Sequence, residues 1–109
     1  MDKEMMKGSV DILVLSIINR GDTYGYEIMK VLRQRSEDHY LMTQGTLYPS
    51  LKRLEKKGYL TSYWGDAPET GVNRKFYSIT NSGKKILEEK IMSWNNITKL
   101  IQQCRGELS

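Results

Sequence analysis

The distribution of apolar residues predicts two helices in the first third of the chain. Residues 10–18 are almost wholly apolar, which suits either a buried strand or a buried helix. We favour a helix over about residues 7–19, because the apolar run contains neither Gly nor Pro. After a turn at residues 20–22, Thr23 is a suitable N-cap for a second helix that ends near Ser36.

A third helix is predicted over residues 44–57, with Thr43 as its N-cap and Gly58 as its stop signal. Pro49 lies inside this segment and has no N–H to donate, so we expect it to distort the helix without ending it. The helix has one apolar face, which should anchor it to the domain. The residues of this face are spaced four and three positions apart: Leu47, Leu51 and Leu54.

Two segments rich in β-branched and aromatic residues, 59–64 and 75–79, predict the strands of a β-hairpin. The polar stretch between them, residues 65–74, contains Pro68 and Gly71 and should form a long tip. The hairpin therefore follows the third helix directly.

The last part of the chain predicts a long amphipathic helix that begins after Thr80 and runs from Asn81 towards Arg105. At about 1.5 Å per residue this helix is about 35 Å long, and a domain of about eighty residues cannot cover its whole apolar face. We therefore expect a partner helix, most simply in a symmetric homodimer. The expected interface residues lie on one stripe: Leu87, Ile91, Trp94, Ile97, Ile101 and Cys104.

Trp94 allows two interpretations of this stripe. The simpler one is that Trp94, in the middle of the stripe, belongs to the dimer core. The alternative is that Trp94 and its symmetry mate, with Ile91 beside them, line a flat hydrophobic pocket for a small aromatic effector.

The order of these elements predicts the fold class. Three short helices followed by a hairpin form a winged helix-turn-helix, so the chain is expected to be mainly α with a small β-hairpin. We expect residues 1–80 to be a DNA-binding domain and residues 81–109 to be a dimerisation helix. In this plan residues 44–57 form the recognition helix, and the hairpin is the wing.

Composition and charge agree with a small domain that binds a polyanion. The chain has 109 residues and a net charge of +4, and its pI is about 9.2. No apolar run reaches the roughly 18 residues that a membrane span needs, and the N-terminus lacks the pattern of a secretory signal. Cys104 is the only cysteine and His39 the only histidine, so we expect no disulfide, no metal and no cofactor, in a cytoplasmic protein.

The face of the recognition helix opposite the leucines carries hydrogen-bond donors and positive charge, which DNA binding requires. Ser50 lies off the leucine stripe and adds a hydroxyl, whereas Lys52 and Arg53 are expected to contact phosphates. The N-terminal end of such a helix usually meets the base edges. The candidates for contacts with bases are therefore Gln44, Thr46 and Tyr48.

The wing adds a second group of candidate DNA contacts. Asn73, Arg74 and Lys75 lie where the loop enters the second strand, and they are expected to contact phosphate or the adjacent minor groove. The alternative is that Arg74 and Lys75 are ordinary edge-strand charges that deter aggregation. Tyr24 can offer its hydroxyl to a phosphate, although a packing role is the simpler interpretation.

Catalytic chemistry is not indicated by any pattern in the sequence. His39 has no Ser or Cys nucleophile beside it in a recognisable motif, and the chain contains neither a glycine-rich phosphate loop nor a paired-carboxylate signature. Cys104 lies on the apolar stripe and is expected to pack as a small hydrophobic residue. The sequence therefore predicts a binding protein and not an enzyme.

Several segments carry the motifs of a known family, and the run Gly-Thr-Leu-Tyr-Pro is the most specific of them. On these motifs the chain resembles the PadR family of transcriptional regulators over roughly residues 7–85. The matching segments are residues 7–15, Tyr24 to Ile28, Gly45 to Glu55, Ser62 to Gly65 and Arg74 to Thr80.

The resemblance implies a homodimeric repressor that binds a palindromic operator in double-stranded DNA. The C-terminal helix with Trp94 is similar to that of the smaller subfamily, whose members dimerise through it, and in multidrug-sensing members the equivalent Trp pair stacks on planar ligands. Release by a small planar or phenolic effector is therefore implied as well. The wing tip, residues 69–73, lacks the glycine-arginine-rich pattern common in the family, which implies a weaker wing contact. The alternative is a winged-helix dimer that binds a ligand or a protein without specific DNA binding.

Overall fold

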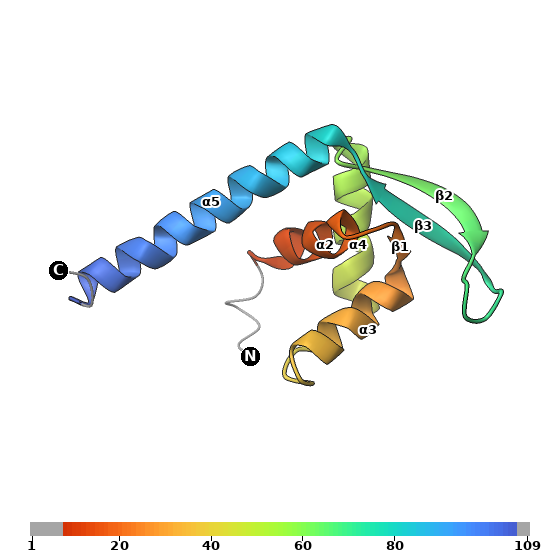
Figure 1. Ribbon diagram of the computed structural model, residues 1–109, viewed down its shortest axis with the longest axis horizontal. Helices are drawn as coiled ribbons and strands as arrows, with labels where there is room; N and C mark the ends of the chain where they lie inside the picture. Colours follow the sequence, from red (N-terminus) through yellow and green to blue (C-terminus); the bar gives the residue numbers. More distant parts are fainter. Residues whose placement is uncertain (1–7, 107–109) are drawn as a thin grey trace.

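A computed structural model describes residues 8–106 of the chain. Within this range the chain forms four helices and three strands, which are labelled in Figure 1. Residue 7, where the first helix was predicted to begin, lies outside the described residues. The elements are α2 (Val10–Asn19), β1 (Thr23–Tyr24), α3 (Gly25–Arg35), α4 (Gln44–Lys56), β2 (Leu60–Asp66), β3 (Asn73–Ile79) and α5 (Asn81–Cys104).

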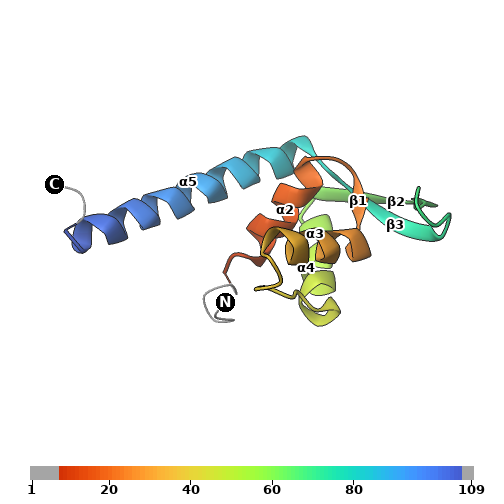
Figure 2. The same cartoon turned by 60° about the horizontal axis from the view of Figure 1, so that its bottom comes forward.

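The arrangement confirms a mainly helical fold with a β-hairpin. Helices α2, α3 and α4 lie together, the hairpin β2–β3 projects on one side, and α5 extends away on the other (Figures 1 and 2). This is the winged helix-turn-helix plan, with α3 and α4 as the helix pair and the hairpin as the wing. None of the helices within residues 8–106 combines the length and apolarity needed to cross a membrane.

The core is built where α2 meets α4. The apolar run of α2 is helical, and its buried residues include Val14, Leu15 and Ile18. The three leucines predicted to anchor α4 are fully buried against this core, as their spacing indicates. Helix α4 continues through Pro49 and is bounded by Thr43, whose side chain does not cap it.

The sheet contains a strand that the sequence pattern did not predict. Thr23 and Tyr24 form β1 and pair with Tyr77 and Phe76 of β3, so the sheet order is β1-β3-β2 and all neighbours are antiparallel. Thr23 is therefore not the N-cap of α3; Tyr24 occupies that position, and no side chain caps the helix there. A two-residue strand is too short to show an alternating pattern, which is why periodicity missed it.

The hairpin is longer, and its tip shorter, than predicted. Residues expected in the loop extend the two strands instead, because Gly65 pairs with Arg74 and Asp66 with Asn73. The tip is closed by a hydrogen bond from the Ala67 N–H to the Val72 carbonyl, at 2.8 Å. Arg74 thus belongs to a regular strand and not to the loop, and Lys75 lies in the strand as predicted.

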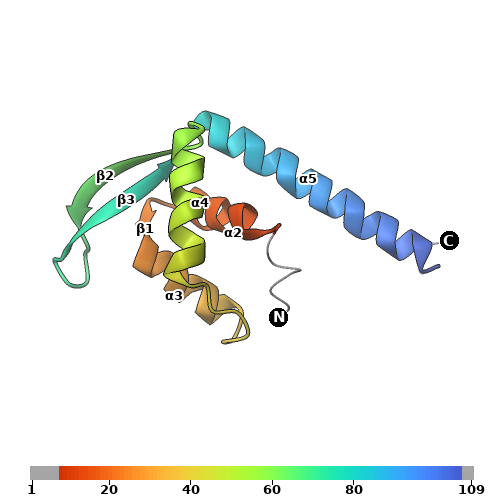
Figure 3. The same ribbon diagram turned by 180° about the vertical axis from the view of Figure 1, so that it is seen from behind.

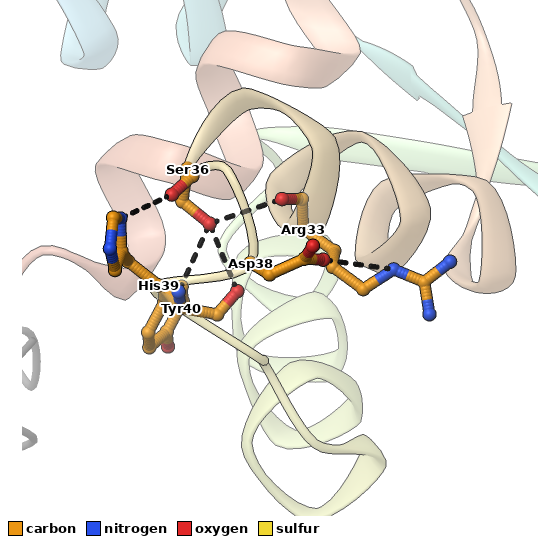
Figure 4. A network of polar contacts seen from close by, with 5 residues as sticks. All are labelled: Arg33, Ser36, Asp38, His39 and Tyr40. Carbon is orange, nitrogen blue, oxygen red and sulfur yellow. Dashed lines mark hydrogen bonds and ion pairs between the residues drawn. The ribbon is translucent and has the colours of Figure 1, made fainter.

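The connection between α3 and α4 is organised around Ser36 (Figure 4). Its hydroxyl accepts a hydrogen bond from the Tyr40 N–H at 3.0 Å, and its carbonyl oxygen lies 3.0 Å from His39 Nδ1. Arg33 and Asp38 form an exposed ion pair across the turn at 3.8 Å. Glu37 and Asp38 both adopt left-handed backbone conformations, so the turn reverses sharply after α3.

Helix α5 belongs to the core only at its beginning. Leu87 was expected in the dimer interface, but it is 3% exposed and packs into the core of its own subunit. Ile91 is partly buried against the same core. Beyond it the helix projects away from the domain, as Figure 3 shows, and the side chains of Trp94, Ile97 and Ile101 are exposed. The core ends near Ile91 because the three-helix domain extends no further along α5.

The junction of the wing and α5 is tightly packed. Thr80 caps α5 as predicted, since its hydroxyl accepts a hydrogen bond from the Gly83 N–H at 3.0 Å. The same hydroxyl donates to the carbonyl of Gly58 at 2.7 Å. A Cβ atom at Gly83 would lie only 2.2 Å from the Tyr59 carbonyl oxygen, so only glycine fits at this position.

We predict that Gly83→Ala lowers the free energy of unfolding by about 1–3 kcal/mol, because backbone and not a flexible side chain must move to admit the methyl group. Urea unfolding followed by circular dichroism measures the change. Ser82→Ala, at the exposed neighbouring position, is the control and should change stability little. Equal stability of the two variants would contradict the close packing at this junction.

Candidate nucleic-acid interface

The face of α4 opposite its leucines is open to solvent over most of its length. Gln44, Thr46 and Lys52 are exposed as predicted, and the Tyr48 side chain is 45% exposed. The Thr46 hydroxyl accepts a hydrogen bond from the Thr43 hydroxyl at 3.3 Å. This face therefore presents a row of polar side chains and one aromatic ring to the outside of the domain.

Ser50 does not belong to this exposed face, contrary to the sequence prediction. It is 1% exposed, and its hydroxyl donates a hydrogen bond of 2.6 Å to Oδ1 of Asp11 in α2. The reason is geometric: three residues after Leu47 and four before Leu54, Ser50 points towards α2 beside the leucines. It holds the recognition helix in place from within and cannot reach DNA from this position.

Asp11 joins a second residue of α4 to α2. Arg53 donates to both of its carboxylate oxygens, from Nη2 to Oδ1 at 2.6 Å and from Nε to Oδ2 at 3.4 Å. Burial raises the pKa of Asp11, but the hydrogen bonds from Arg53 and Ser50 and the positive charges of Arg53 and Lys90 outweigh it, so the pKa is lowered overall. The Arg53 side chain is exposed, but it already forms an ion pair with Asp11 within the domain.

The wing residues are held by contacts with the body of the domain. The Arg74 guanidinium lies 5.8 Å from the ring centre of Tyr24 and 5.9 Å from that of Tyr26, and Nε of Arg74 is buried. Lys75 forms an ion pair with Glu55 of α4 at 3.7 Å. Asn73 was predicted to contact DNA and is exposed near the tip, where its amide donates to Asp66 at 3.2 Å.

A groove of about 380 Å³ separates the recognition helix from the wing. Tyr48 lines it from α4, Arg74 and Lys75 line it from β3, and Trp64 lines it from β2. Tyr24 also borders the groove, but its side chain is largely buried and packs edge-on against Phe76 with 5.2 Å between ring centres. The groove thus brings together the predicted wing residues and one predicted residue of the recognition helix, Tyr48. The other predicted residues of α4 do not line it: Gln44, Thr46, Ser50, Lys52 and Arg53.

Two polar contacts that hold this interface were not found from the sequence. The Glu55 carboxylate accepts a hydrogen bond from the Ser62 hydroxyl, which ties α4 to the wing. The Tyr63 hydroxyl donates to Asp22 at 2.7 Å, which ties the wing to the turn before β1. Both pairs join residues from separate elements, so no local pattern marks them. The one signal is for the first pair, because Glu55 is an acidic residue within a basic segment.

A hydrophobic hollow lies on the other side of the molecule, where α5 leaves the domain. It measures about 230 Å³ and is lined by Trp94 and Ile91 of α5, by Ile12 and Leu13 of α2, and by Ser9. The two residues proposed as effector contacts therefore lie together. Across residues 8–106, no cluster of His, Cys, Asp and Glu side chains is arranged to hold a metal ion.

The sequence profile of the "Transcriptional regulator PadR-like family" matches residues 14–89 of the chain, which include α4 and the whole wing. The chain belongs to the PadR-like family. Members of this family are transcriptional regulators that bind DNA, not enzymes. The exposed face of α4 and the basic groove both lie within the segment that matches the family.

Solved structures place the chain among PadR-family proteins as well. A transcriptional regulator from Clostridium thermocellum is 38% identical, with a TM-score of 0.85 over 94% of this chain and 96% of that one. A PadR-family regulator from Clostridium difficile is 39% identical, with a TM-score of 0.73 over 87% of this chain and 96% of that one. The fold described above is thus the fold of this family.

Two curated relatives that are named as transcriptional regulators are longer proteins. The Bacillus subtilis protein named "Negative transcriptional regulator PadR" is 24% identical over 82% of this chain and 48% of its own length. The Escherichia coli protein named "Transcriptional regulator YqjI" is 28% identical over 75% of this chain, which is 37% of its own length. The chain therefore spans less than half of the length of each of these two relatives.

We predict that Asp11→Ala lowers the free energy of unfolding by about 1–3 kcal/mol, because it leaves the buried Ser50 hydroxyl without its acceptor. Asp11→Ala combined with Ser50→Ala should recover part of this loss, since both polar partners are then removed. Chemical denaturation measures the three variants, and Glu88→Ala, at an exposed site on α5, is the control.

The effect of Asp11 should depend on pH with a defined sign. Because its pKa is lowered in the folded protein, its stabilising contribution is present at neutral pH and is lost as the pH falls below the usual range of an aspartate. The stability difference between the wild type and Asp11→Asn should therefore shrink in acid. A difference that grows in acid would contradict this assignment.

Proposed function

We propose that the protein is a homodimeric repressor in the cytoplasm that binds a palindromic operator in double-stranded DNA and is released by a small planar or phenolic effector. The observation that carries DNA binding is the orientation of α4. Its leucine face is buried on α2, and its opposite face, with Gln44, Thr46, Tyr48 and Lys52, is open beside the basic groove of the wing. The repressor role is supported by the word "negative" in the name of the Bacillus subtilis relative.

In this proposal α4 enters the major groove, where Gln44, Thr46 and Tyr48 contact bases or lie near them and Lys52 contacts a phosphate. Arg74, Lys75 and Asn73 face the adjacent backbone from the wing. Arg53 contributes through the guanidinium surface that Asp11 leaves exposed. Two copies of α4 then meet successive major grooves about 34 Å apart.

Dimerisation is supported by the apolar surface of α5. The exposed fractions of the Trp94, Ile97 and Ile101 side chains are 48%, 54% and 53%, and the helix projects clear of its own domain (Figure 1). Cys104 is exposed further along the same helix. An apolar stripe of this length is stabilised when a second α5 packs on it, and two-fold symmetry is the simplest arrangement.

Effector binding is supported by the hydrophobic hollow beside Trp94. Its walls are apolar side chains from α5 and α2, and the exposed indole offers a flat surface on which an aromatic ring can stack. An effector seated there alters the angle between α5 and its own domain. Because α5 joins the two subunits in this proposal, the distance between the two α4 helices changes and the operator no longer fits.

A second candidate function is a winged-helix dimer that binds ligands or proteins without specific DNA recognition. The observation that favours it is the internal pairing of two predicted phosphate contacts, Arg53 with Asp11 and Lys75 with Glu55. Fluorescence anisotropy against duplex DNA from the upstream region of the protein's own gene separates the two. Salt-sensitive binding that prefers this duplex over a scrambled one supports the repressor, and its absence supports the second candidate.

We predict that Lys52→Ala weakens binding to all duplexes alike and flattens the plot of log affinity against log salt by about 0.9 for each subunit bound, because one phosphate contact is lost. Anisotropy titrations at several salt concentrations measure the slope. Lys85→Ala removes the same charge from an exposed position of α5 and should leave the slope unchanged. A change in sequence preference would instead place Lys52 at a base.

We predict that Trp94→Ala weakens the homodimer and removes the binding of planar aromatic compounds, since it deletes the largest exposed apolar side chain at the hollow. Sedimentation velocity measures the monomer–dimer equilibrium. Met92→Ala, two residues away and therefore turned to another face of α5, is the control. In a Trp64→Phe background Trp94 is the only tryptophan, so quenching of its fluorescence by a planar dye or a phenolic acid reports binding directly.

A further inference from the structure

Gly25, the first residue of α3, is a buried glycine that the backbone does not require. The glycines with left-handed backbone are Gly21, Gly58, Gly71 and Gly106 among residues 8–106, and Gly25 is not one of them. Any small residue could therefore adopt its conformation. The reason for glycine must lie in the space around the missing side chain.

A side chain of the recognition helix, that of Tyr48, fills that space. A Cβ atom at Gly25 would lie 2.5 Å from the hydroxyl oxygen of Tyr48 and 2.9 Å from its Cζ atom. The Tyr48 ring therefore lies against the start of α3, in the place that a side chain at Gly25 would occupy. Its remaining surface faces the groove between α4 and the wing, where it is 45% exposed.

The two neighbours of Gly25, Tyr24 and Tyr26, also line this groove and contact Arg74 of the wing. The Arg74 guanidinium of the wing lies over the rings of Tyr24 and Tyr26, at 5.8 Å and 5.9 Å from their centres. Residues 24–26, at the start of α3, thus contact both Tyr48 of the recognition helix and Arg74 of the wing. Tyr48 and Arg74 both line the groove, together with Trp64 and Lys75.

We propose that Gly25 is a positioning residue for DNA binding, which seats Tyr48 so that its ring and the Arg74 guanidinium receive one sugar–phosphate unit of the DNA backbone between them. The guanidinium neutralises the phosphate, and the ring packs against the neighbouring deoxyribose. This inference rests on the proposed DNA binding and adds a residue that itself contacts no DNA. Its chemistry requires only that Tyr48 keep its place relative to Arg74.

Gly25→Ala tests the proposal, because the methyl group displaces the far end of a flexible side chain and not backbone. The variant should keep its fold and thermal midpoint but bind the upstream duplex about tenfold more weakly, the loss of one well-packed aromatic contact. The slope against salt should not change, since no charge is removed. Gly8→Ala, where nothing lies within 4 Å of the added methyl group, is the matched control.

A double-mutant cycle with Tyr48→Ala decides whether the effect acts through Tyr48. In the Tyr48→Ala protein, the further change Gly25→Ala should alter affinity less than twofold, because no ring remains to be displaced. Losses that multiply in the double variant would overturn the proposal, as would wild-type affinity or a lost fold in Gly25→Ala. A slope that flattens by about 0.9 per subunit would assign the effect to Arg74 and overturn the role of Tyr48. If the wild type itself binds no DNA, the proposed function fails before this test applies.

Discussion

The interface between the leucine face of α4 and helix α2 determines the orientation of the α4 residues that are proposed to contact DNA. Leu47, Leu51 and Leu54 are buried to within 1% of their surface, so α4 cannot rotate about its axis without exposing at least one of them. Each exposed leucine would cost about 1.5–3 kcal/mol, a large part of the stability of a small domain. The polar face of α4 is therefore held outward by packing on the opposite side of the same helix.

Polar contacts between α4 and α2 fix the position of α4 more narrowly than the buried leucines do. Packing of the leucines has little directional preference, whereas the hydrogen bonds from Ser50 and Arg53 to Asp11 require a defined position of α4 against α2. As a consequence, part of the positive charge of Arg53 is neutralised by Asp11 within the domain. With a net charge of +4, the protein then depends on groove shape and on its remaining cations for contact with DNA.

The sequence predicted a feature well where the feature depends on residues close together in the chain, and poorly where it depends on contacts between separate elements. Periodicity found the four helices and the hairpin because each has a repeated local pattern. The prediction for Ser50 was wrong, because its polar side chain suggested the solvent-exposed face of the helix. A helical wheel places Ser50 beside the leucines. Periodicity also assigned Leu87 to a partner, because an apolar stripe does not reveal where one subunit's core ends. Asp11 and Gly25 act through residues distant in sequence, and Glu55 acts through residues of the wing, so no local pattern records these contacts.

Helix α2 is the element that joins the two surfaces of the molecule. Ile12 and Leu13 line the hollow beside Trp94, and the adjacent residue Asp11 holds the recognition helix. Lys90 of α5 also lies close enough to lower the pKa of Asp11 through its charge. The proposed effector, bound in the hollow, would contact α2, which positions α4 within one subunit, as well as α5, the helix proposed to join the two subunits. Effector release in this protein would then combine a change in the angle between subunits with a shift of α4 against α2, and the first requires a dimer whereas the second does not.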